Sequence, residues 1–478
     1  MKKNLFTVLL LVASAASAQQ DEGYNIHISF RPFKNQYVYL GYYFGNQYPI
    51  VDSAMLDANS EGTFKGTKKL GGGVYLIGFP DKSRFFELLI DKQQHFSVIA
   101  DSSSLPAGLQ FQHSPDNDMF NSYQQYMTVR GREIDDAKKQ LVSAKNHQDS
   151  SKWAGIIEAK NKDINHYREN IIKNNPSSLL AVLLTAMREP VIPAASKQPG
   201  GKYDSLYAYH YYKNHFWDGV NFYDDRLART TFFDTKLTKY FQQLVYPDAD
   251  SVIKEIDWMM GYASISPDMQ KFLLLKFVNR YINQQYMWED KVFVHLFEKY
   301  FANQHYPWLN AQGEEIIANR AYSLMANMLG SYAADILLPD TAGNNTPLYS
   351  VQAPYTLVCF WDPTCGHCKE TLPKIDSIYQ AKWKAMGVKI YAVGRETGGT
   401  KADWLRFIQQ HHLQEWTNVF YSKNEDAERI TQNTPSYSQL YDVQTFPTLY
   451  LLDGAKRIIA KKLSFEQMDE VLKQKAGN

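Results

Sequence analysis

Residues 361–369 read Trp-Asp-Pro-Thr-Cys-Gly-His-Cys-Lys, and they place two cysteines three positions apart in a chain of 478 residues that has only 3 cysteines. The preceding residues, Tyr355 to Trp361, are mostly β-branched or aromatic and predict a buried strand. Apolar residues then follow at helical spacing from Cys365 to Trp383. Cys365 is therefore predicted to lie at the N-terminus of a helix that follows a central strand.

A pair of thiols at a helix start is suited to disulfide exchange. The nucleophile in this reaction is the thiolate, and the unpaired N–H groups and dipole of a helix N-terminus stabilise an anion. Cys368 lies one turn further along, where it can attack a mixed disulfide on Cys365. His367, as a donor or a cation, favours the thiolate and makes the disulfide a stronger oxidant. We predict that Cys365 attacks, that Cys368 resolves, and that Gly366, His367 and Trp361 modulate the pair.

Zinc sites also use the Cys-x-x-Cys spacing, but they usually add a second pair of Cys or His ligands. The remaining candidates are Cys359, inside the predicted strand, and the adjacent pair His411-His412. Two adjacent histidines on a helix would point in different directions. The sequence therefore favours a redox dithiol over a metal site, and it indicates no cofactor.

From about Leu348 to the C-terminus the sequence resembles the thioredoxin superfamily, and within it the envelope thiol:disulfide reductases related to cytochrome-maturation proteins. The features that carry the resemblance are Trp361 before the two cysteines, Pro373 five residues after the second, and the loop Thr445-Phe446-Pro447-Thr448. A hairpin pattern and an amphipathic helix follow that loop. The resemblance implies an α/β thioredoxin-like fold, a cis peptide bond before Pro447, and a ledge at Phe446 and Pro447 on which an extended substrate docks.

This sequence departs from the pattern at the positions of the proton relay. Cys359 stands where thioredoxin carries a buried aspartate, and Thr371 stands where the related reductases often carry a glutamate. Glu370 is one residue earlier, on a different face of the helix. The proton relay is therefore left open. Cys359 is expected to be a bystander, because burial raises the pKa of a thiol and an extended strand carries it away from the helix start.

The stretch between Cys368 and Pro447 is longer than in a minimal thioredoxin, with an additional predicted helix at Ala402–His411 and a strand at Thr417–Tyr421. This insertion resembles the envelope reductases and the peroxiredoxins. Neither cysteine has the Pro-x-x-x-Thr-x-x-Cys pattern of a peroxidatic cysteine, so a peroxiredoxin-like antioxidant is an alternative rather than the first interpretation. The other alternative is a non-catalytic envelope binding protein with a vestigial thioredoxin domain.

The N-terminus predicts export. Met1-Lys2-Lys3 is followed by an apolar run from Leu5 to Val12 and by Ala16-Ser17-Ala18, the pattern of a secretory signal peptide cleaved after Ala18. We expect a protein that is periplasmic in a Gram-negative host and has no stable membrane insertion, because no later apolar run reaches membrane-spanning length. A formal charge of +1 and a pI near 7.7 argue against nucleic acid as a partner.

The expected partners are protein thiols and disulfides, with a membrane thiol reductase as the electron donor if the chain acts as a reductant. Upstream of the redox module, alternation such as Ile26-x-Ile28-x-Phe30 predicts a small antiparallel β-sandwich, which resembles an uncharacterised β domain found before envelope thioredoxin modules. Helical spacing follows from Asp116. We predict a multidomain chain: signal peptide 1–18, β-sandwich 19–112, helical segment 113–190, helical domain 191–338, linker 339–347 and thioredoxin-like domain 348–478.

Overall fold

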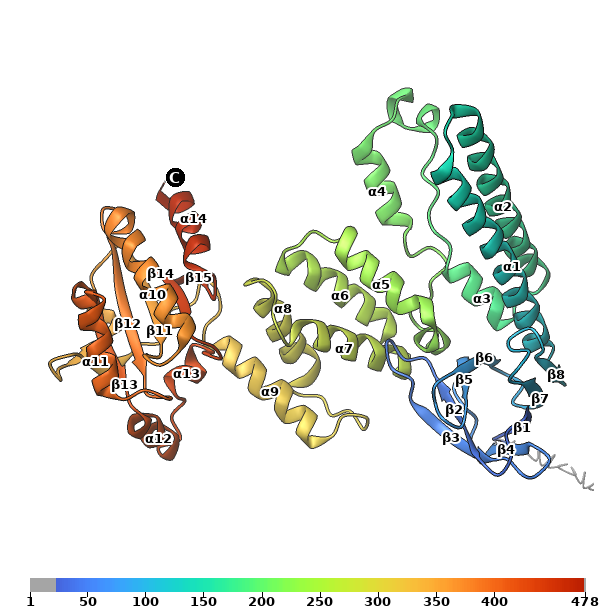
Figure 1. Cartoon of the computed structure of the whole chain (residues 1–478), viewed down its shortest axis with the longest axis horizontal. Coiled ribbons are helices and arrows are strands. Elements are labelled where there is room, and N and C mark those ends of the chain that lie inside the picture. The colour runs from blue at the N-terminus through green and yellow to red at the C-terminus, as the bar shows by residue number, and fades with distance from the viewer. Residues whose placement is uncertain (1–22, 477–478) are drawn as a thin grey trace, which may run out of the picture. The chain divides into compact units, whose positions relative to one another are not determined.

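The computed structural model describes residues 23–476, so the predicted signal peptide at 1–18 lies outside the described residues (Figure 1). The chain divides into two compact units. The first runs to Leu244 and includes Trp258–Leu273, and the second consists of Val245–Asp257 and the chain from Leu274 onward. Within residues 23–476, no helix has the length and apolar character needed to cross a membrane.

The first unit begins with a β-sandwich of two four-stranded sheets, ordered β4-β1-β7-β8 and β3-β2-β5-β6. Alternate residues of the first strand, including Ile26, Ile28 and Phe30, point into a core that both sheets share. The predicted sandwich is confirmed, although β1 and β7 pair in parallel because the chain visits the other sheet between them. The strands are β1 (Tyr24–Arg31), β2 (Tyr37–Tyr42), β3 (Ile50–Met55), β4 (Glu61–Gly66), β5 (Gly73–Gly78), β6 (Phe85–Ile90), β7 (His95–Asp101) and β8 (Gln110–Gln112).

Helices follow the sandwich, as the helical spacing predicted. The buried side chain of Asn117 fixes the start of α1 to the sheet, accepting from the N–H of Leu89 at 2.7 Å and donating to its carbonyl at 2.9 Å. The helices are α1 (Pro115–Ser143), α2 (His147–Asn174), α3 (Leu179–Ala186), α4 (Ser205–His215) and α5 (Thr231–Gln243). Two further helices, α6 (Ala249–Ala263) and α7 (Pro267–Tyr281), contribute residues to both units.

The second unit continues with α8 (Glu289–Leu296) and α9 (Ala311–Met325), and it then forms a short hairpin of β9 (Leu337–Pro339) and β10 (Asn345–Pro347). This hairpin occupies the segment in which the sequence predicted a linker. Leu338 and Leu348 are buried in the core of the C-terminal domain, so the segment is part of that domain's packing.

The C-terminal domain is built on a five-stranded sheet with the order β13-β12-β11-β14-β15. β11 pairs in parallel with β12 and antiparallel with β14, which places β11 at the centre. The predicted α/β fold of this part is confirmed. Its elements are β11 (Tyr355–Trp361), α10 (Gly366–Ile378), β12 (Val388–Arg395), α11 (Lys401–Gln410), β13 (Thr417–Tyr421), α12 (Lys423–Thr431), α13 (Tyr437–Leu440), β14 (Thr448–Asp453), β15 (Ile458–Lys461) and α14 (Phe465–Ala476).

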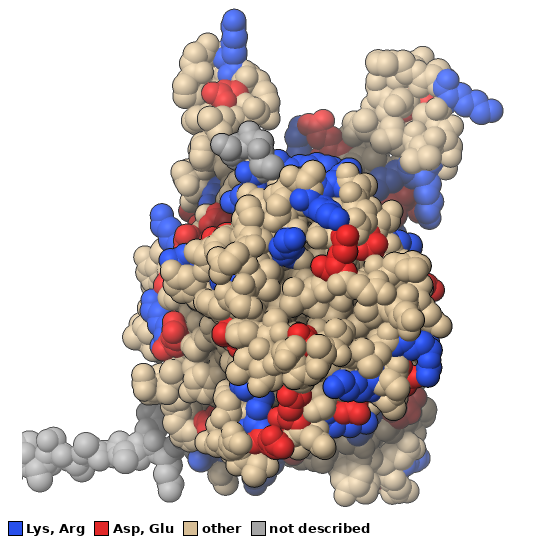
Figure 2. Space-filling model, turned by 90° about the vertical axis from the view of Figure 1, so that its left-hand side faces the viewer, with Lys and Arg blue, Asp and Glu red and all other residues tan. Residues whose placement is uncertain are grey.

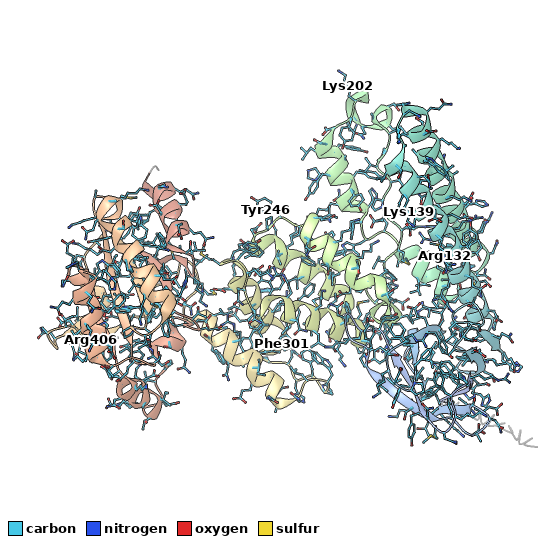
Figure 3. All side chains as sticks on the ribbon, in the orientation of Figure 1. Arg132, Lys139, Lys202, Tyr246, Phe301 and Arg406 are labelled. Carbon is cyan, nitrogen blue, oxygen red and sulfur yellow. The ribbon has the colours of Figure 1, made fainter. Side chains whose placement is uncertain are left out.

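Both faces of this sheet are covered, which explains why β11 reads as a continuous apolar run. Leu357, Cys359 and Trp361 join a core formed with α10, α11 and α14. Val358 and Phe360 face the opposite core, where α13 and the β9–β10 hairpin pack. Side chains fill the space between the sheet and its helices (Figure 3). On the surface that Figure 2 shows, Lys and Arg are interspersed with Asp and Glu, in keeping with the formal charge of +1.

Candidate active site

The two cysteines of the motif occupy different environments at the start of α10. Cys365 is the N-cap residue of the helix and is half-buried, and its Sγ lies 3.6 Å from the carbonyl oxygen of Phe446. Cys368 lies within the first turn and is fully buried. All three cysteines of the chain are unpaired thiols. The accessible sulfur is thus the one at the helix N-terminus, where backbone N–H groups favour an anion.

Burial raises the pKa of the Cys368 thiol, and a hydrogen bond with Cys365 raises it further, against the backbone N–H of Asp362, which lowers it. Burial also raises the pKa of Cys359 to about 12. Cys359 and Cys368 belong to one core, which β11 and α10 share. Cys359 therefore faces the side of the sheet that α10 covers.

Asp362 holds the loop that leads into the motif. Its buried carboxylate accepts hydrogen bonds from the N–H of Thr364 at 2.6 Å, from the N–H of Gly398 at 3.3 Å and from the hydroxyl of Thr397. Burial disfavours the charged form, but the hydrogen bonds from Thr364 and Thr397 outweigh it and lower the pKa of Asp362 to about 2. The ionised carboxylate thereby connects the loop before α10 to the loop after β12.

The three residues predicted to modulate the dithiol differ in their exposure to solvent. Gly366 and His367 are exposed between the cysteines. Trp361 is fully buried, and its ring packs 5.0 Å from that of Phe407. Its position at the end of a strand covered on both faces accounts for this burial. Trp361 can therefore influence the dithiol through core packing and does not present its ring to a substrate.

Phe446 and Pro447 lie beside the dithiol, and the peptide bond between them is cis. Pro447 lines a cleft of about 850 Å³ that His367 also borders. The loop before Pro447 is closed by a hydrogen bond of 2.6 Å from the Thr448 hydroxyl to the carbonyl of Thr445. The structure thus brings together the cysteine pair, His367 and the predicted docking ledge.

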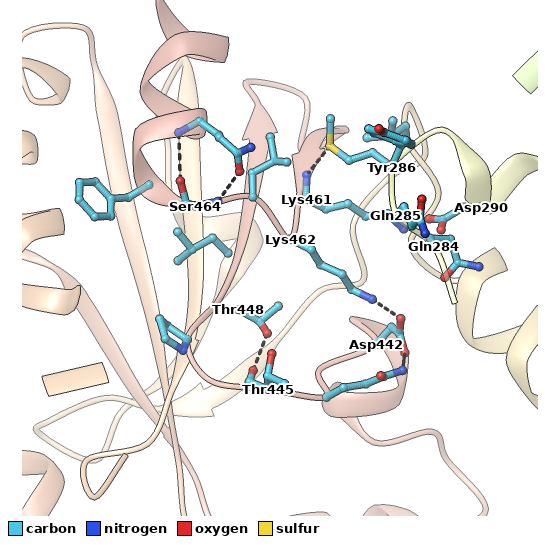
Figure 4. A pocket seen from close by; sticks show the side chains of 18 of the residues that line it. Gln284, Gln285, Tyr286, Asp290, Asp442, Thr445, Thr448, Lys461, Lys462 and Ser464 are labelled. Atoms are coloured by element: carbon cyan, nitrogen blue, oxygen red, sulfur yellow. Dashed lines mark hydrogen bonds and ion pairs between the residues drawn. The ribbon is translucent and has the colours of Figure 1, made fainter. Parts of the chain in front are cut away.

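The cleft has a second wall that no motif predicted. It is formed by the loop Asn283–Trp288, which connects α7 to α8 in the helical segment ahead of the C-terminal domain. Figure 4 shows Gln285 and Tyr286 on one side of the cleft and Thr445 and Thr448 on the other. The loop has no sequence signal of its own, because its place beside the cleft depends on long-range contacts such as the hydrogen bond between Lys461 and Met287, which are 174 residues apart.

Most charged groups along the cleft neutralise one another. Lys461 forms a buried ion pair with Asp290 and donates to the carbonyl of Asn327 at 2.8 Å. Asp442 accepts from Arg320 at 2.7 Å and from Lys462. Burial lowers the pKa of Lys461. Among residues 23–476, no group of three or more His, Cys, Asp or Glu side chains could hold a metal ion.

Comparison with known proteins gives different matches for the helical part and the C-terminal part of the chain. A family profile described as a domain of unknown function, DUF5106, matches residues 145–325. A curated thioredoxin-like protein from Haemophilus influenzae is 29% identical over 124 residues, which cover 25% of this chain and 62% of that relative. The chain thus spans less than two thirds of the length of this curated relative.

Two solved structures are similar to the C-terminal domain. A domain of a possible thiol-disulfide isomerase from Cytophaga hutchinsonii is 34% identical, with 31% of this chain and 94% of that chain covered and a TM-score of 0.27. A thiol:disulfide interchange protein from Bacteroides sp. is 27% identical, with 31% and 91% covered and a TM-score of 0.26.

Proposed function

We propose, from the similarity of the C-terminal domain to a curated thioredoxin-like protein, that this protein is an exported thiol:disulfide oxidoreductase that exchanges disulfides with proteins of the cell envelope. Its reacting groups are Cys365 and Cys368. One observation carries the proposal: the half-buried Cys365 lies at a helix N-terminus beside Phe446 and Pro447, with the buried Cys368 in hydrogen-bonding contact behind it.

In the reducing direction, the Cys365 thiolate attacks one sulfur of a substrate disulfide. A bond forms between Cys365 and that sulfur, the substrate S–S bond breaks, and the departing thiolate takes up a proton. Cys368 then loses its proton and attacks the sulfur of Cys365, which releases the second substrate thiol. The substrate gains two electrons, and the enzyme is left with a Cys365–Cys368 disulfide.

The burial of Cys368 leaves the first attack to Cys365. A thiol whose pKa is raised stays protonated and does not compete with Cys365 for the incoming disulfide. The cation or donor at His367, exposed between the cysteines, favours the reduced dithiol and raises the oxidising strength of the disulfide. A membrane thiol reductase is the class of donor that would return two electrons to the disulfide and make the protein a reductant.

The test is turnover of insulin disulfides by the full chain with a dithiol reductant. We expect catalysis that is lost when Cys365→Ser and Cys368→Ser are combined. A folded wild-type protein without turnover would favour the non-catalytic binding protein. Rapid consumption of hydrogen peroxide that requires Cys365 would favour the peroxiredoxin-like antioxidant.

Export is tested separately by expressing the full chain in a Gram-negative host and sequencing the N-terminus of the periplasmic product. Cleavage after Ala18 gives a mature chain that begins at Gln19. Retention of Met1 on a cytoplasmic product would contradict the proposed localisation while leaving the chemistry at Cys365 unaffected.

A further inference from the structure

The loop Asn283–Trp288 is held firmly from its own side. Glu289, which is fully buried, accepts hydrogen bonds from the backbone N–H of Gln285 at 2.6 Å and of Tyr286 at 3.3 Å. The same carboxylate forms an ion pair with Arg280 at the end of α7. A buried carboxylate with a cationic partner and backbone donors fixes the path of the chain at the residues that border the cleft.

The C-terminal domain holds the same loop from the opposite side. Arg320 donates to the carbonyl of Ile282 at 2.9 Å and to Asp442 at 2.7 Å, so one guanidinium bridges the loop start and the segment before Pro447. The backbone N–H of Lys461 donates to the sulfur of Met287 at 3.2 Å, and Met287 packs against the domain core. The loop is therefore fixed relative to the docking ledge.

The loop presents two aromatic side chains to the cleft. The rings of Tyr286 and Trp288 are parallel within 4°, with centroids 6.1 Å apart, and both residues line the cleft. Tyr286 is 59% exposed although its backbone is tied to a buried carboxylate. A rigid, exposed aromatic surface binds apolar side chains at a low cost in conformational entropy.

Three of the four Lys and Arg side chains that line the cleft are paired with acidic side chains, which favours an uncharged occupant. Arg320, Lys461 and Lys462 are paired with Asp290 or Asp442, so the second wall offers amide and aromatic groups rather than an excess of either charge. The other wall includes His367 and Pro447, which are neighbours in sequence of the reacting Cys365 and of Phe446, whose carbonyl oxygen lies 3.6 Å from the Cys365 Sγ. An extended polypeptide that reaches Cys365 would place the side chain next to its own cysteine against the aromatic pair.

We propose that the loop Asn283–Trp288 is a substrate-binding element, and that Tyr286 and Trp288 select protein segments carrying an aromatic side chain beside the reacting cysteine. This inference rests on the proposed function for its substrate, an extended segment of an oxidised protein. It assigns a role in recognition to part of the helical segment, and it makes Tyr286 and Trp288 specificity-determining rather than catalytic residues.

The test separates binding from catalysis. Two short peptides that differ only in having Phe or Ser after their single cysteine, blocked as a methyl thioether, are titrated into the full chain carrying Cys365→Ser and Cys368→Ser. Tryptophan fluorescence reports binding. We expect about fivefold tighter binding of the Phe peptide, and Tyr286→Ser should reduce this preference to less than about twofold. Trp288→Leu tests the second ring. The matched control is Tyr246→Ser, which removes another exposed tyrosine outside the cleft (Figure 3).

Turnover is then measured with the same peptides as disulfide-linked dimers and with hydroxyethyl disulfide, which has no aromatic neighbour. Tyr286→Ser should lower kcat/KM for the Phe dimer about fivefold and leave hydroxyethyl disulfide within about twofold. A folded Tyr286→Ser protein that keeps the full Phe preference, or one that loses all substrates equally, overturns the inference while catalysis stands. A preference in binding that depends on Tyr286, without turnover of any disulfide, supports the inference and overturns the enzymatic proposal.

Discussion

Two buried carboxylates hold two loops near the candidate site, the loop that leads into the dithiol and the loop that forms the second wall of the cleft, and they use different partners. Asp362 accepts from hydroxyl and backbone N–H groups of Thr364, Thr397 and Gly398. Glu289 accepts from the backbone of the aromatic loop and is also paired with the cationic Arg280. Hydrogen bonds from neutral donors lower the pKa of Asp362, whereas the carboxylate of Glu289 is paired with a guanidinium.

Because the two carboxylates hold different loops, each is expected to affect a different kinetic constant. Asp362 lies three residues before the reacting cysteine, so its loss displaces Cys365 itself. Glu289 holds a loop that contains no reacting group, so its loss should affect substrate binding. We therefore expect kcat to respond to Asp362 and KM to respond to Glu289.

The largest effect is expected at the cysteines, because their sulfurs are the proposed reacting atoms and the two carboxylates only hold the neighbouring loops. Cys368→Ser should lower steady-state turnover at least about 10³-fold and accumulate a mixed disulfide through Cys365, since nothing resolves it. Mass spectrometry of the trapped complex identifies the linked residue. Accumulation with Cys365→Ser instead would reverse the roles of the two thiols.

The next effect is expected for Asp362→Asn. An amide nitrogen in place of one carboxylate oxygen faces N–H or O–H donors, so at least one group on Thr364 or Thr397 loses its acceptor. Turnover of the Phe and Ser dimers and of hydroxyethyl disulfide should all fall, by about tenfold in kcat. The control is Glu370→Gln, which removes an exposed carboxylate near Cys368 without removing a hydrogen bond to the loop. If both substitutions lowered kcat equally, the effect of Asp362→Asn would come from the loss of a negative charge and not from the loss of its hydrogen bonds.

The sequence predicted the elements around the dithiol much better than the loop that forms the second wall of the cleft. The strand Tyr355–Trp361, the helix after it and the inserted helix and strand before Pro447 were all predicted, because each has a local period or a turn signal. The burial of Trp361 agrees with the buried strand predicted for Tyr355–Trp361, but the core that its ring joins was not predicted, because a strand covered on both faces has no alternation that separates its two sides.

The second wall could not be read from the sequence for a different reason. Asn283–Trp288 is a short polar and aromatic stretch between two helices, like many exposed loops. Its relation to the cleft depends on Arg320 and Asp442, which are 122 residues apart, and no local pattern encodes that pairing. Asp362 was visible in the motif, but its hydrogen bonds depend on where the loop after β12 passes.

A more modest effect is expected for Glu289→Gln. The substitution leaves Arg280 without its anion and weakens the hydrogen bonds to Gln285 and Tyr286, which should destabilise the fold by about 1–2 kcal/mol because Arg280 is partly exposed. KM for the Phe dimer should rise several-fold, with kcat for hydroxyethyl disulfide unchanged. Glu470→Gln, in an exposed pair with Lys473, is the control and should have little effect. A fall in kcat alone would place Glu289 with Asp362 in positioning the dithiol.

The contribution of Asp362 to stability should also depend on pH. The pKa of Asp362 is lowered to about 2 in the folded state, below its unfolded value of about 3.9, so its stabilising contribution is fully present above about pH 4 and is lost as the pH falls through 2. The difference in thermal midpoint between wild type and Asp362→Asn should therefore be constant from about pH 5 to 8 and shrink below about pH 4. A difference that shrinks already near neutral pH would mean that Asp362 is not held as an anion by its hydrogen bonds.

The smallest effect is expected at Cys359, although its thiol shares a core with Cys368. Burial raises the pKa of Cys359 to about 12, so its thiol stays protonated and is not a nucleophile. Cys359→Ala should lower stability by about 1 kcal/mol through a small cavity and keep kcat within about twofold between pH 6 and 9. Alkylation mapping of the resting enzyme provides a second measurement and should find Cys359 unmodified. A folded Cys359→Ala protein with a large loss of turnover confined to the resolving step would instead make Cys359 the proton relay that replaces the missing carboxylate.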